Sequence, residues 1–253
     1  MTNSDSYAII RRLSGNAAIA QSVERILGKD EVASSNLASS SKNYAKPNGF
    51  AFFVFIRFTK LRCQKELANM KWMIASDIHG SAYYCEKLLE AYHREQADRL
   101  LLLGDILYHG PGNDLPRDYA PKKVIAMLNE MKRHILCVRG NCDTEVDQMV
   151  LQFPVLADYA VLTAGNRLIY VTHGHVYNSS NLPPIQPGDI LLHGHTHIPA
   201  CEEYDTHTYL NPGSVSIPKE NSPHSYLTFD GNEFVWKDMD GVAYQRYTLN
   251  QNI

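Results

Sequence analysis

The stretch ILLHGHTHIP places three histidines, His193, His195 and His197, at every second position after an apolar run. Alternate side chains of an extended strand point to the same face of its sheet, so a strand over residues 189–197 would align the three imidazoles. Such a face is able to bind a metal ion. It is equally the kind of polar end that a buried strand shows when it leaves the core. The remainder of the sequence decides between these readings.

Similar polar residues follow other apolar runs of the chain, and most of them lie next to a glycine. Because loops at the carboxyl ends of parallel strands converge on one crevice, we expect these side chains to meet. Carboxylate, amide and imidazole groups together suit divalent ions such as Mn²⁺, Zn²⁺, Fe²⁺ and Ni²⁺. Seven ligands exceed one tetrahedral site but suit two ions that share a carboxylate, an arrangement that catalyses phosphoryl displacement. The candidates are Asp77, His79, Asp105, Asn141, His173 or His175, His195 and His197. His173 is favoured over His175 because it directly precedes a glycine.

The first half of the chain after residue 70 alternates strands with helices. Apolar runs predict strands over 71–76, 98–105 and 134–141. A helix over 81–96 has Ser81 as its N-cap, and a second helix begins at Pro121. The order β-α-β-α-β implies parallel strands joined by helical crossovers. The apolar helix faces consist of Tyr84, Leu88 and Tyr92 in the first helix, and of Val124, Leu128 and Met131 in the second.

Strands dominate the second half. Residues 159–175 predict a hairpin that turns at Gly165 and Asn166, and the histidine-rich strand over 189–197 follows a proline-rich loop. Two packed sheets with helices outside, an α/β fold, is the architecture that accounts for this pattern most economically. Further short strands are expected near 201–204, 208–210, 226–229 and 233–237.

The ordered motifs DxH, GD, GNxD, a glycine-flanked histidine and GHTH resemble those of the calcineurin-like metallophosphoesterases, from about Met70 to the end of the chain. The resemblance implies a four-layer α/β/β/α sandwich, in which helices flank two mixed β-sheets, and a metal-dependent phosphodiesterase activity. A hydroxide held between two divalent ions, manganese being the first choice, would attack phosphorus. The family pattern does not require His193. One ion would take Asp77, His79 and His197, the other Asn141, His173 and His195, with Asp105 bridging both.

Three further residues are candidates for contact with the substrate. Many members of the family carry a histidine where this chain has Cys142, and that histidine is thought to protonate the leaving group. A thiol is a weaker donor, so Cys142 as the catalytic acid would favour activated or aryl diesters; otherwise it is a thiol that lines the site. His109 and His175 are candidates for substrate binding, the alternatives being a solvated loop residue and a neighbour of the ligands. Asn211 and Ser214 are expected to shape a turn.

Charge and cysteine content limit the partners and the compartment. Residues 1–69 carry ten Lys or Arg and five Asp or Glu, whereas residues 70–253 carry fourteen and twenty-two. The acidic main body argues against general nucleic-acid binding. The apolar run over 50–56 is too short to cross a membrane. Five cysteines without a CxxC pair favour the cytoplasm.

The domain prediction separates an N-terminal extension, residues 1–69, from a metallophosphoesterase domain, residues 70–253. The extension resembles the translation of a transfer-RNA gene, so we expect either a mis-assigned start or a poorly ordered tail. The expected partner is a small phosphodiester, and a homo-oligomer is an open possibility. Two alternatives to a phosphodiesterase remain: a catalytically silent protein-binding scaffold on the same fold, and a phosphomonoesterase or dinucleoside-polyphosphate hydrolase.

Overall fold

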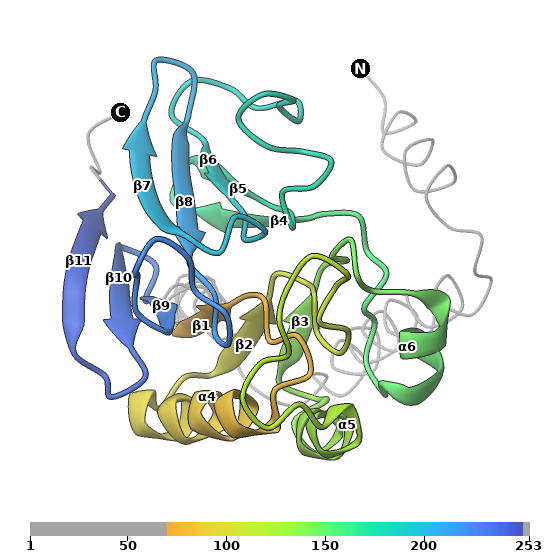
Figure 1. Ribbon diagram of the computed structural model, residues 1–253. Helices are drawn as coiled ribbons and strands as arrows, with labels where there is room; N and C mark the ends of the chain where they lie inside the picture. The colour runs from red at the N-terminus through yellow and green to blue at the C-terminus, as the bar shows by residue number, and fades with distance from the viewer. Residues whose placement is uncertain (1–69, 250–253) are drawn as a thin grey trace, which may run out of the picture. The chain divides into compact units, whose positions relative to one another are not determined.

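The computed structural model describes residues 70–249, which form two mixed β-sheets and three helices (Figure 1). The prediction for residues 1–69 lies outside the described residues. The first sheet has the order β11-β10-β9-β1-β2-β3. Its strands are β1 (Trp72–Ala75), β2 (Arg99–Leu102), β3 (Ile135–Cys137), β9 (Ser225–Phe229), β10 (Glu233–Asp238) and β11 (Ala243–Thr248).

The second sheet has the order β4-β5-β6-β8-β7. The strands β5, β6 and β8 run parallel, and β4 and β7 pair antiparallel at the two edges. The predicted hairpin is formed by β4 and β5, and Gly165 at its turn has φ +62°. The bounds are β4 (Ala160–Ala164), β5 (Arg167–Val171), β6 (Ile190–Leu192), β7 (Pro199–Glu203) and β8 (Thr208–Pro212).

The predicted β-α-β-α-β unit is confirmed. The strands β1, β2 and β3 are parallel neighbours, and α4 (Ala82–Glu95) and α5 (Pro121–Glu130) connect them. Ser81 caps α4 by accepting a hydrogen bond from the Tyr84 backbone N–H at 3.3 Å. Pro121 occupies the first turn of α5, where its missing N–H costs nothing. A short third helix, α6 (Glu145–Val150), follows β3.

Two apolar cores separate the layers. Met73 and Ala75 of β1 belong to the core shared with α4 and α5, whereas Ile74 belongs to the core shared with the second sheet. This alternation follows from the period of two along a strand. Figure 1 shows α4 and α5 on the side of β1–β3 that faces away from β5, β6 and β8. The α/β class with two packed mixed sheets is therefore confirmed.

The outer face of the second sheet carries a loop in the described residues. No helix occurs between β4 and β11 in this part of the chain. Residues 172–189 connect β5 to β6, and the hydroxyl of the buried Tyr170 donates a hydrogen bond to the Pro184 carbonyl at 2.9 Å. Among the described residues, α4 and α5 thus cover the first sheet, and no helix covers the outer face of the second. No helix within residues 70–249 is both long and apolar enough to cross a membrane.

One expectation about the histidine-rich strand is wrong. The strand β6 ends at Leu192, and His193, His195 and His197 lie in the loop that follows. His195 and His197 have φ values of +67° and +64°, a left-handed conformation that an extended strand does not contain. Their alternation in sequence is therefore not strand alternation.

Candidate metal centre

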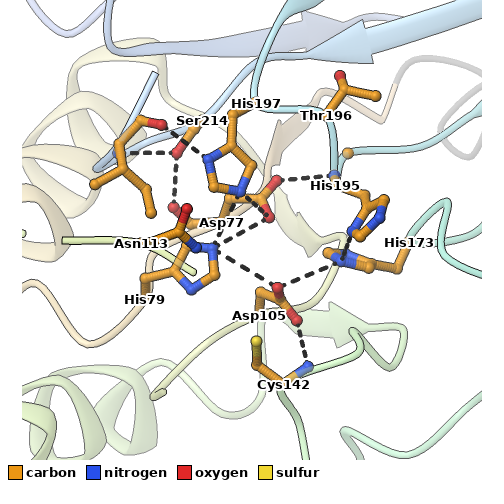
Figure 2. Close-up of polar contacts among 12 residues, drawn as sticks. Asp77, His79, Asp105, Asn113, Cys142, His173, His195, Thr196, His197 and Ser214 are labelled. Carbon is orange, nitrogen blue, oxygen red and sulfur yellow. Dashed lines mark hydrogen bonds and ion pairs between the residues drawn. The ribbon is translucent and has the colours of Figure 1, made fainter. Parts of the chain in front are cut away.

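The seven candidate ligands converge from the carboxyl ends of parallel strands, as expected for an α/β crevice. In the first sheet, two of them follow β1, one follows β2 and one lies in the loop after β3. In the second sheet, one follows β5 and two follow β6. Figure 2 shows six of them gathered around one point: Asp77, His79, Asp105, His173, His195 and His197.

Three of these residues form a first ligand group: Asp77, His79 and His197. The Nε2 atoms of the two imidazoles lie 3.2 Å apart. Asp77 Oδ1 lies 3.5 Å from the first Nε2 and 3.3 Å from the second. The Nδ1 atoms face backbone carbonyls, that of Tyr108 at 2.7 Å and that of Ile217 at 2.8 Å. A nitrogen that faces a carbonyl must carry the proton, so both Nε2 atoms of neutral imidazoles present lone pairs.

The residues expected to form a second ligand group, Asn141, His173 and His195, also lie close together. His173 Nδ1 donates to the Leu103 carbonyl at 2.7 Å, which leaves the lone pair of the neutral ring on Nε2. That Nε2 lies 3.0 Å from Asn141 Oδ1 and 3.2 Å from His195 Nδ1. The three side chains thus bring an amide oxygen and two ring nitrogens together, a set of donor atoms that suits a divalent cation.

Asp105 lies between the two groups. Its Oδ2 is 3.7 Å from His79 Nε2 and 3.4 Å from His173 Nε2. Its Oδ1 accepts a hydrogen bond from the Cys142 backbone N–H at 2.8 Å, which fixes the carboxylate plane. One carboxylate oxygen is thus directed toward both groups of imidazoles, the position that a bridging ligand requires.

The residues present fit a cationic group. Asp77 Oδ1 is buried and accepts no hydrogen bond from the described residues, which is costly for a carboxylate oxygen. Burial would raise the pKa of Asp77, but the neighbouring His197 and His79 imidazoles outweigh burial and hold that pKa well below its usual range. Burial would lower the pKa of His173, but Asp105 and Asp77 reverse that effect and raise it to about 9. The centre therefore attracts positive charge, carried either by a proton or by a metal ion.

Five of the candidate ligands have a left-handed backbone. The φ values are +61° for Asp77, +49° for His79, +55° for Asp105, +67° for His195 and +64° for His197. Residues other than glycine adopt this region rarely, and such strain concentrates at functional sites. The backbone around the centre is thus held in an unfavourable conformation by the surrounding fold.

Two glycines permit the close approach of the loops. A Cβ on Gly140 would lie 2.1 Å from Asp105 Oδ1, and a Cβ on Gly194 would lie 1.9 Å from Ser76 Oγ and 2.7 Å from Asp77 Oδ2. No side chain fits in either place, so both positions require glycine for steric reasons.

Asp143 holds the loops after β2 and β3 together, and the sequence analysis assigned it no role. Its buried carboxylate accepts hydrogen bonds from the backbone N–H groups of Asp105 at 2.8 Å, Ile106 at 2.9 Å and Gly140 at 2.8 Å. The available signal was its place in the GNxD motif. Asp143 therefore positions the bridging candidate without facing the ligand groups itself.

Residues at the end of β8 and directly after it support the loops that carry the candidate ligands. The hydroxyls of Ser214 and Ser216 both donate to the Asp77 carbonyl at 3.0 Å. Asn211 Nδ2 donates to the Gly194 carbonyl at 2.9 Å, next to His195. Asn211 and Ser214 thus shape loops beside the centre, in agreement with the expectation from the sequence.

A cavity of about 150 Å³ opens beside the ligand groups. The buried Cys142 lines it, and its Sγ lies within 4.8 Å of the ligand atoms of His79 and Asp105. Burial, and then the charge of Asp105, raise the pKa of the thiol, so it keeps its proton. The complete lining is Asp105, Gly110, Pro111, Gly112, Asn113, Asn141, Cys142, His195, His197 and Lys219; sequence reasoning did not single out Asn113 or Lys219.

Three other histidines do not line this cavity. The His109 ring packs edge-on against Tyr108 and Tyr119, with centroids 4.7 and 5.2 Å away, although the residues that follow it do form the cavity wall. His175 is exposed, and its ring centroid lies 5.4 Å from that of His173. His193 is buried and stacks on Tyr209 at 4.4 Å.

Comparison with known proteins extends over this whole region. Residues 70–233 match the family described as "Calcineurin-like phosphoesterase superfamily domain". "Phosphodiesterase YfcE" of Escherichia coli (strain K12) is 47% identical over 163 residues, which cover 64% of this chain and 89% of that protein. "Probable metallophosphoesterase YsnB" of Bacillus subtilis (strain 168) is 28% identical over 168 residues, 62% of this chain and 82% of that protein.

A solved structure agrees with the sequence comparison. The structure described as that of Yfce, a phosphoesterase from E. coli, superposes with a TM-score of 0.69 and 43% sequence identity. The superposition covers 72% of this chain and 100% of that one. The matched region contains every candidate ligand of both groups.

Proposed function

Because this chain belongs to the calcineurin-like phosphoesterase superfamily, we propose that it is a divalent-metal-dependent phosphodiesterase that acts on small phosphodiesters. The proposal is supported by the relatives named above and by the donor atoms that converge in the centre. The observation that carries it is the place of Asp105 Oδ2 between His79 Nε2 and His173 Nε2, one ring nitrogen from each group. A carboxylate in that place suits two cations, one on each side of it.

The two ligand groups would each hold one divalent ion. The first ion would bind Asp77, His79 and His197, the second Asn141, His173 and His195, and Asp105 would bridge both. Manganese is our first choice, with zinc, iron and nickel as alternatives, because the mixed O and N donor set suits all four. When bound, such a pair activates water and neutralises charge on a phosphoryl group.

The protein groups around the ions would orient and protect the reaction. Asp143 accepts buried hydrogen bonds from the backbone N–H groups of Asp105 and Ile106 and from that of Gly140, so the bridging carboxylate is preorganised. The cavity of about 150 Å³ limits the group that fits beside the phosphate. The protonated Cys142 thiol lines that cavity and is the candidate acid for a leaving group.

The expected location in the cytoplasm stays a prediction.

A catalytically silent scaffold is the principal rival. Such a scaffold would be expected to have lost ligands, and all seven candidate ligands are present in this chain. A phosphomonoesterase is the second rival, and the substitution of Cys142 for the histidine of many relatives disfavours it. Both rivals differ from the proposal in measurable activity.

The test compares hydrolysis of bis-p-nitrophenyl phosphate with that of p-nitrophenyl phosphate. Chelator-treated full-length protein is resupplied with Mn²⁺, Zn²⁺, Fe²⁺ or Ni²⁺, and bound metal is counted by elemental analysis. We expect two ions per chain and turnover of the diester in preference to the monoester. Asp105→Asn should reduce turnover more than about a hundredfold, since a lost ligand costs at least as much as a lost supporting residue. Asp205→Asn, at an exposed site between β7 and β8, is the matched control.

The outcomes separate the hypotheses. Binding of two ions without turnover of either ester would favour the scaffold. Preferential turnover of the monoester would favour the phosphomonoesterase. Binding of a single ion would contradict the dinuclear arrangement, whatever the activity.

A further inference from the structure

Lys219 brings a free positive charge to the cavity. It is the one Lys or Arg among the described residues that line the cavity, and its side chain is exposed. Four other described lysines form ion pairs with carboxylates, as Lys71 and Lys237 do with Glu95, but no such pair includes Lys219. Its ammonium group is therefore available to an anion from solution.

The backbone of Lys219 is fixed beside the first ligand group. Its N–H donates to the carbonyl of His197 at 3.2 Å. Its own carbonyl accepts hydrogen bonds from the N–H of Ser222 at 3.0 Å and from the hydroxyl of Ser222 at 2.6 Å. Glu220 and Asn221 have φ values of +54° and +56°, which makes the turn tight. The side chain thus extends from an anchored position next to a candidate ligand.

The remaining lining does not supply another fixed cation. The opposite wall consists of Gly110, Pro111, Gly112 and Asn113, which carry no charge. The Asn113 amide donates to the His109 carbonyl at 2.9 Å, so this loop is held in its own conformation. Negative charge enters the lining through Asp105, whose carboxylate faces the ligand groups. An anion in the cavity would accordingly meet Lys219 as its cationic partner from the protein.

We propose that Lys219, whose backbone lies next to His197, binds a non-bridging oxygen of the substrate phosphate in the cavity. A compact ammonium with three N–H donors suits a phosphate oxygen as a point charge. This inference rests on the proposed function, because it takes the occupant of the cavity to be a phosphoester. Lys219 is then a substrate-binding residue that positions the phosphate for attack by water.

The test measures phosphate binding and turnover separately. Inorganic phosphate is titrated into the metal-loaded full-length protein by calorimetry, and KM and kcat for bis-p-nitrophenyl phosphate are measured at several salt concentrations. The variants are Lys219→Gln and Lys219→Arg. The control is Lys132→Gln, which removes the same charge just before β3, at the end of the first sheet opposite the centre. Bound metal is counted in every variant.

We expect Lys219→Gln to weaken phosphate binding and raise KM about tenfold each, with unchanged metal content. Lys219→Arg should stay within about threefold of the wild type. Salt should weaken phosphate binding less in the Gln variant than in the wild type, because one charge is gone. Equal phosphate affinity and equal salt dependence in wild type and Lys219→Gln would overturn the inference while leaving the proposed function intact. A wild-type protein that neither binds phosphate nor hydrolyses the diester would overturn both.

Discussion

Cys142 combines a place in the cavity wall with a proton that is hard to remove. The thiol lines the cavity, and burial together with the charge of Asp105 raises its pKa. An acid that holds its proton this firmly transfers it poorly to a departing oxygen. An enzyme with such a donor should therefore favour leaving groups that depart without protonation, as p-nitrophenolate does.

Replacing Cys142 by histidine should broaden the range of leaving groups. We expect Cys142→His to accelerate hydrolysis of alkyl diesters about tenfold or more, because an imidazolium is the better general acid. Hydrolysis of bis-p-nitrophenyl phosphate should change less than about threefold. The measurement is log(kcat/KM) against leaving-group pKa, whose slope should become shallower. Cys142→Ala serves as the control, and an equal gain in that variant, or no gain in either, would contradict the role in proton donation.

The sequence indicated the candidate ligands more readily than the residues that support them. Asp77, Asp105 and the histidines are residue types that bind metal ions, and each follows an apolar run, so the sequence alone indicates metal binding. Lys219 has no such signal, because a lysine in a polar loop is usually a solvated surface residue. Only the turn at residues 219–222 and the distant β6 loop bring it to the cavity. Roles that depend on tertiary contacts between distant loops are not encoded in local pattern.

At the scale of elements, one carboxylate joins the loops that follow β2 and β3. Asp143 accepts three backbone N–H groups, and two of them belong to the segment that carries Asp105. Both loops would otherwise hold buried, unpaired N–H groups beside the centre. The relative placement of the two strand ends therefore depends on a residue that binds no ion in our proposal.

Asp143→Asn should weaken the hydrogen bonds that join the loops after β2 and β3. An amide has one acceptor oxygen where the carboxylate has two, and its NH₂ group would face a backbone N–H. We expect the free energy of unfolding to fall by about 2 kcal/mol, the cost of a buried donor left without its partner. Chemical denaturation of the metal-free protein measures this fall. Asp205→Asn should change stability by less than about 0.5 kcal/mol, and an equal effect of the two substitutions would refute the bracing role.

The sequence predicted the helices and strands that have a strong apolar pattern, and it missed those that have a weak one. The buried runs of β1, β2 and β5 and the caps of α4 and α5 carry clear signals. The strand β11 lies at a sheet edge with mostly exposed or half-buried side chains, and α6 has six residues, none of them buried. Neither element shows apolar periodicity, so neither was expected. The histidine-rich strand was predicted to be too long, because histidines at every second position do not reveal the left-handed φ of His195 and His197.

At the scale of the whole molecule, Glu95 connects α4 to the first sheet. Its carboxylate lies 3.0 Å from Lys71 Nζ and 2.7 Å from Lys237 Nζ, and it accepts a hydrogen bond from the Tyr226 hydroxyl at 2.9 Å. Burial would raise the pKa of Glu95, but these three partners outweigh burial and lower it to about 2. The helix is thus tied to segments that lie far apart in the sequence.

The lowered pKa predicts the pH range in which this connection is lost. The folded pKa of about 2 lies below the ordinary value of 4.5, so Glu95 stabilises the fold fully above that value. The contribution decreases as the pH falls from about 4.5 toward 2. We expect Glu95→Gln to lower the free energy of unfolding by about 2 kcal/mol at pH 7, after allowance for solvent screening.

Urea denaturation of wild type and Glu95→Gln between pH 7 and pH 3 checks this prediction. The difference between the two proteins should be constant from pH 7 to about 5 and should shrink below that range. Glu86→Gln, on the exposed side of α4, is the control and should show no such change with pH. A difference that stays constant down to pH 3 would show that Glu95 does not titrate as described.

The left-handed backbone at five candidate ligands restricts how this site can evolve or be redesigned. Asparagine, aspartate and histidine tolerate positive φ better than most residues, and two of these three types occupy the five positions. Donor chemistry and backbone geometry therefore select from the same short list of amino acids. A designer who wanted a thiolate or glutamate ligand set would have to rebuild the loops before changing the metal. The same two requirements apply to natural substitutions, so we expect these loops to keep their amino-acid composition while the outer surface diverges.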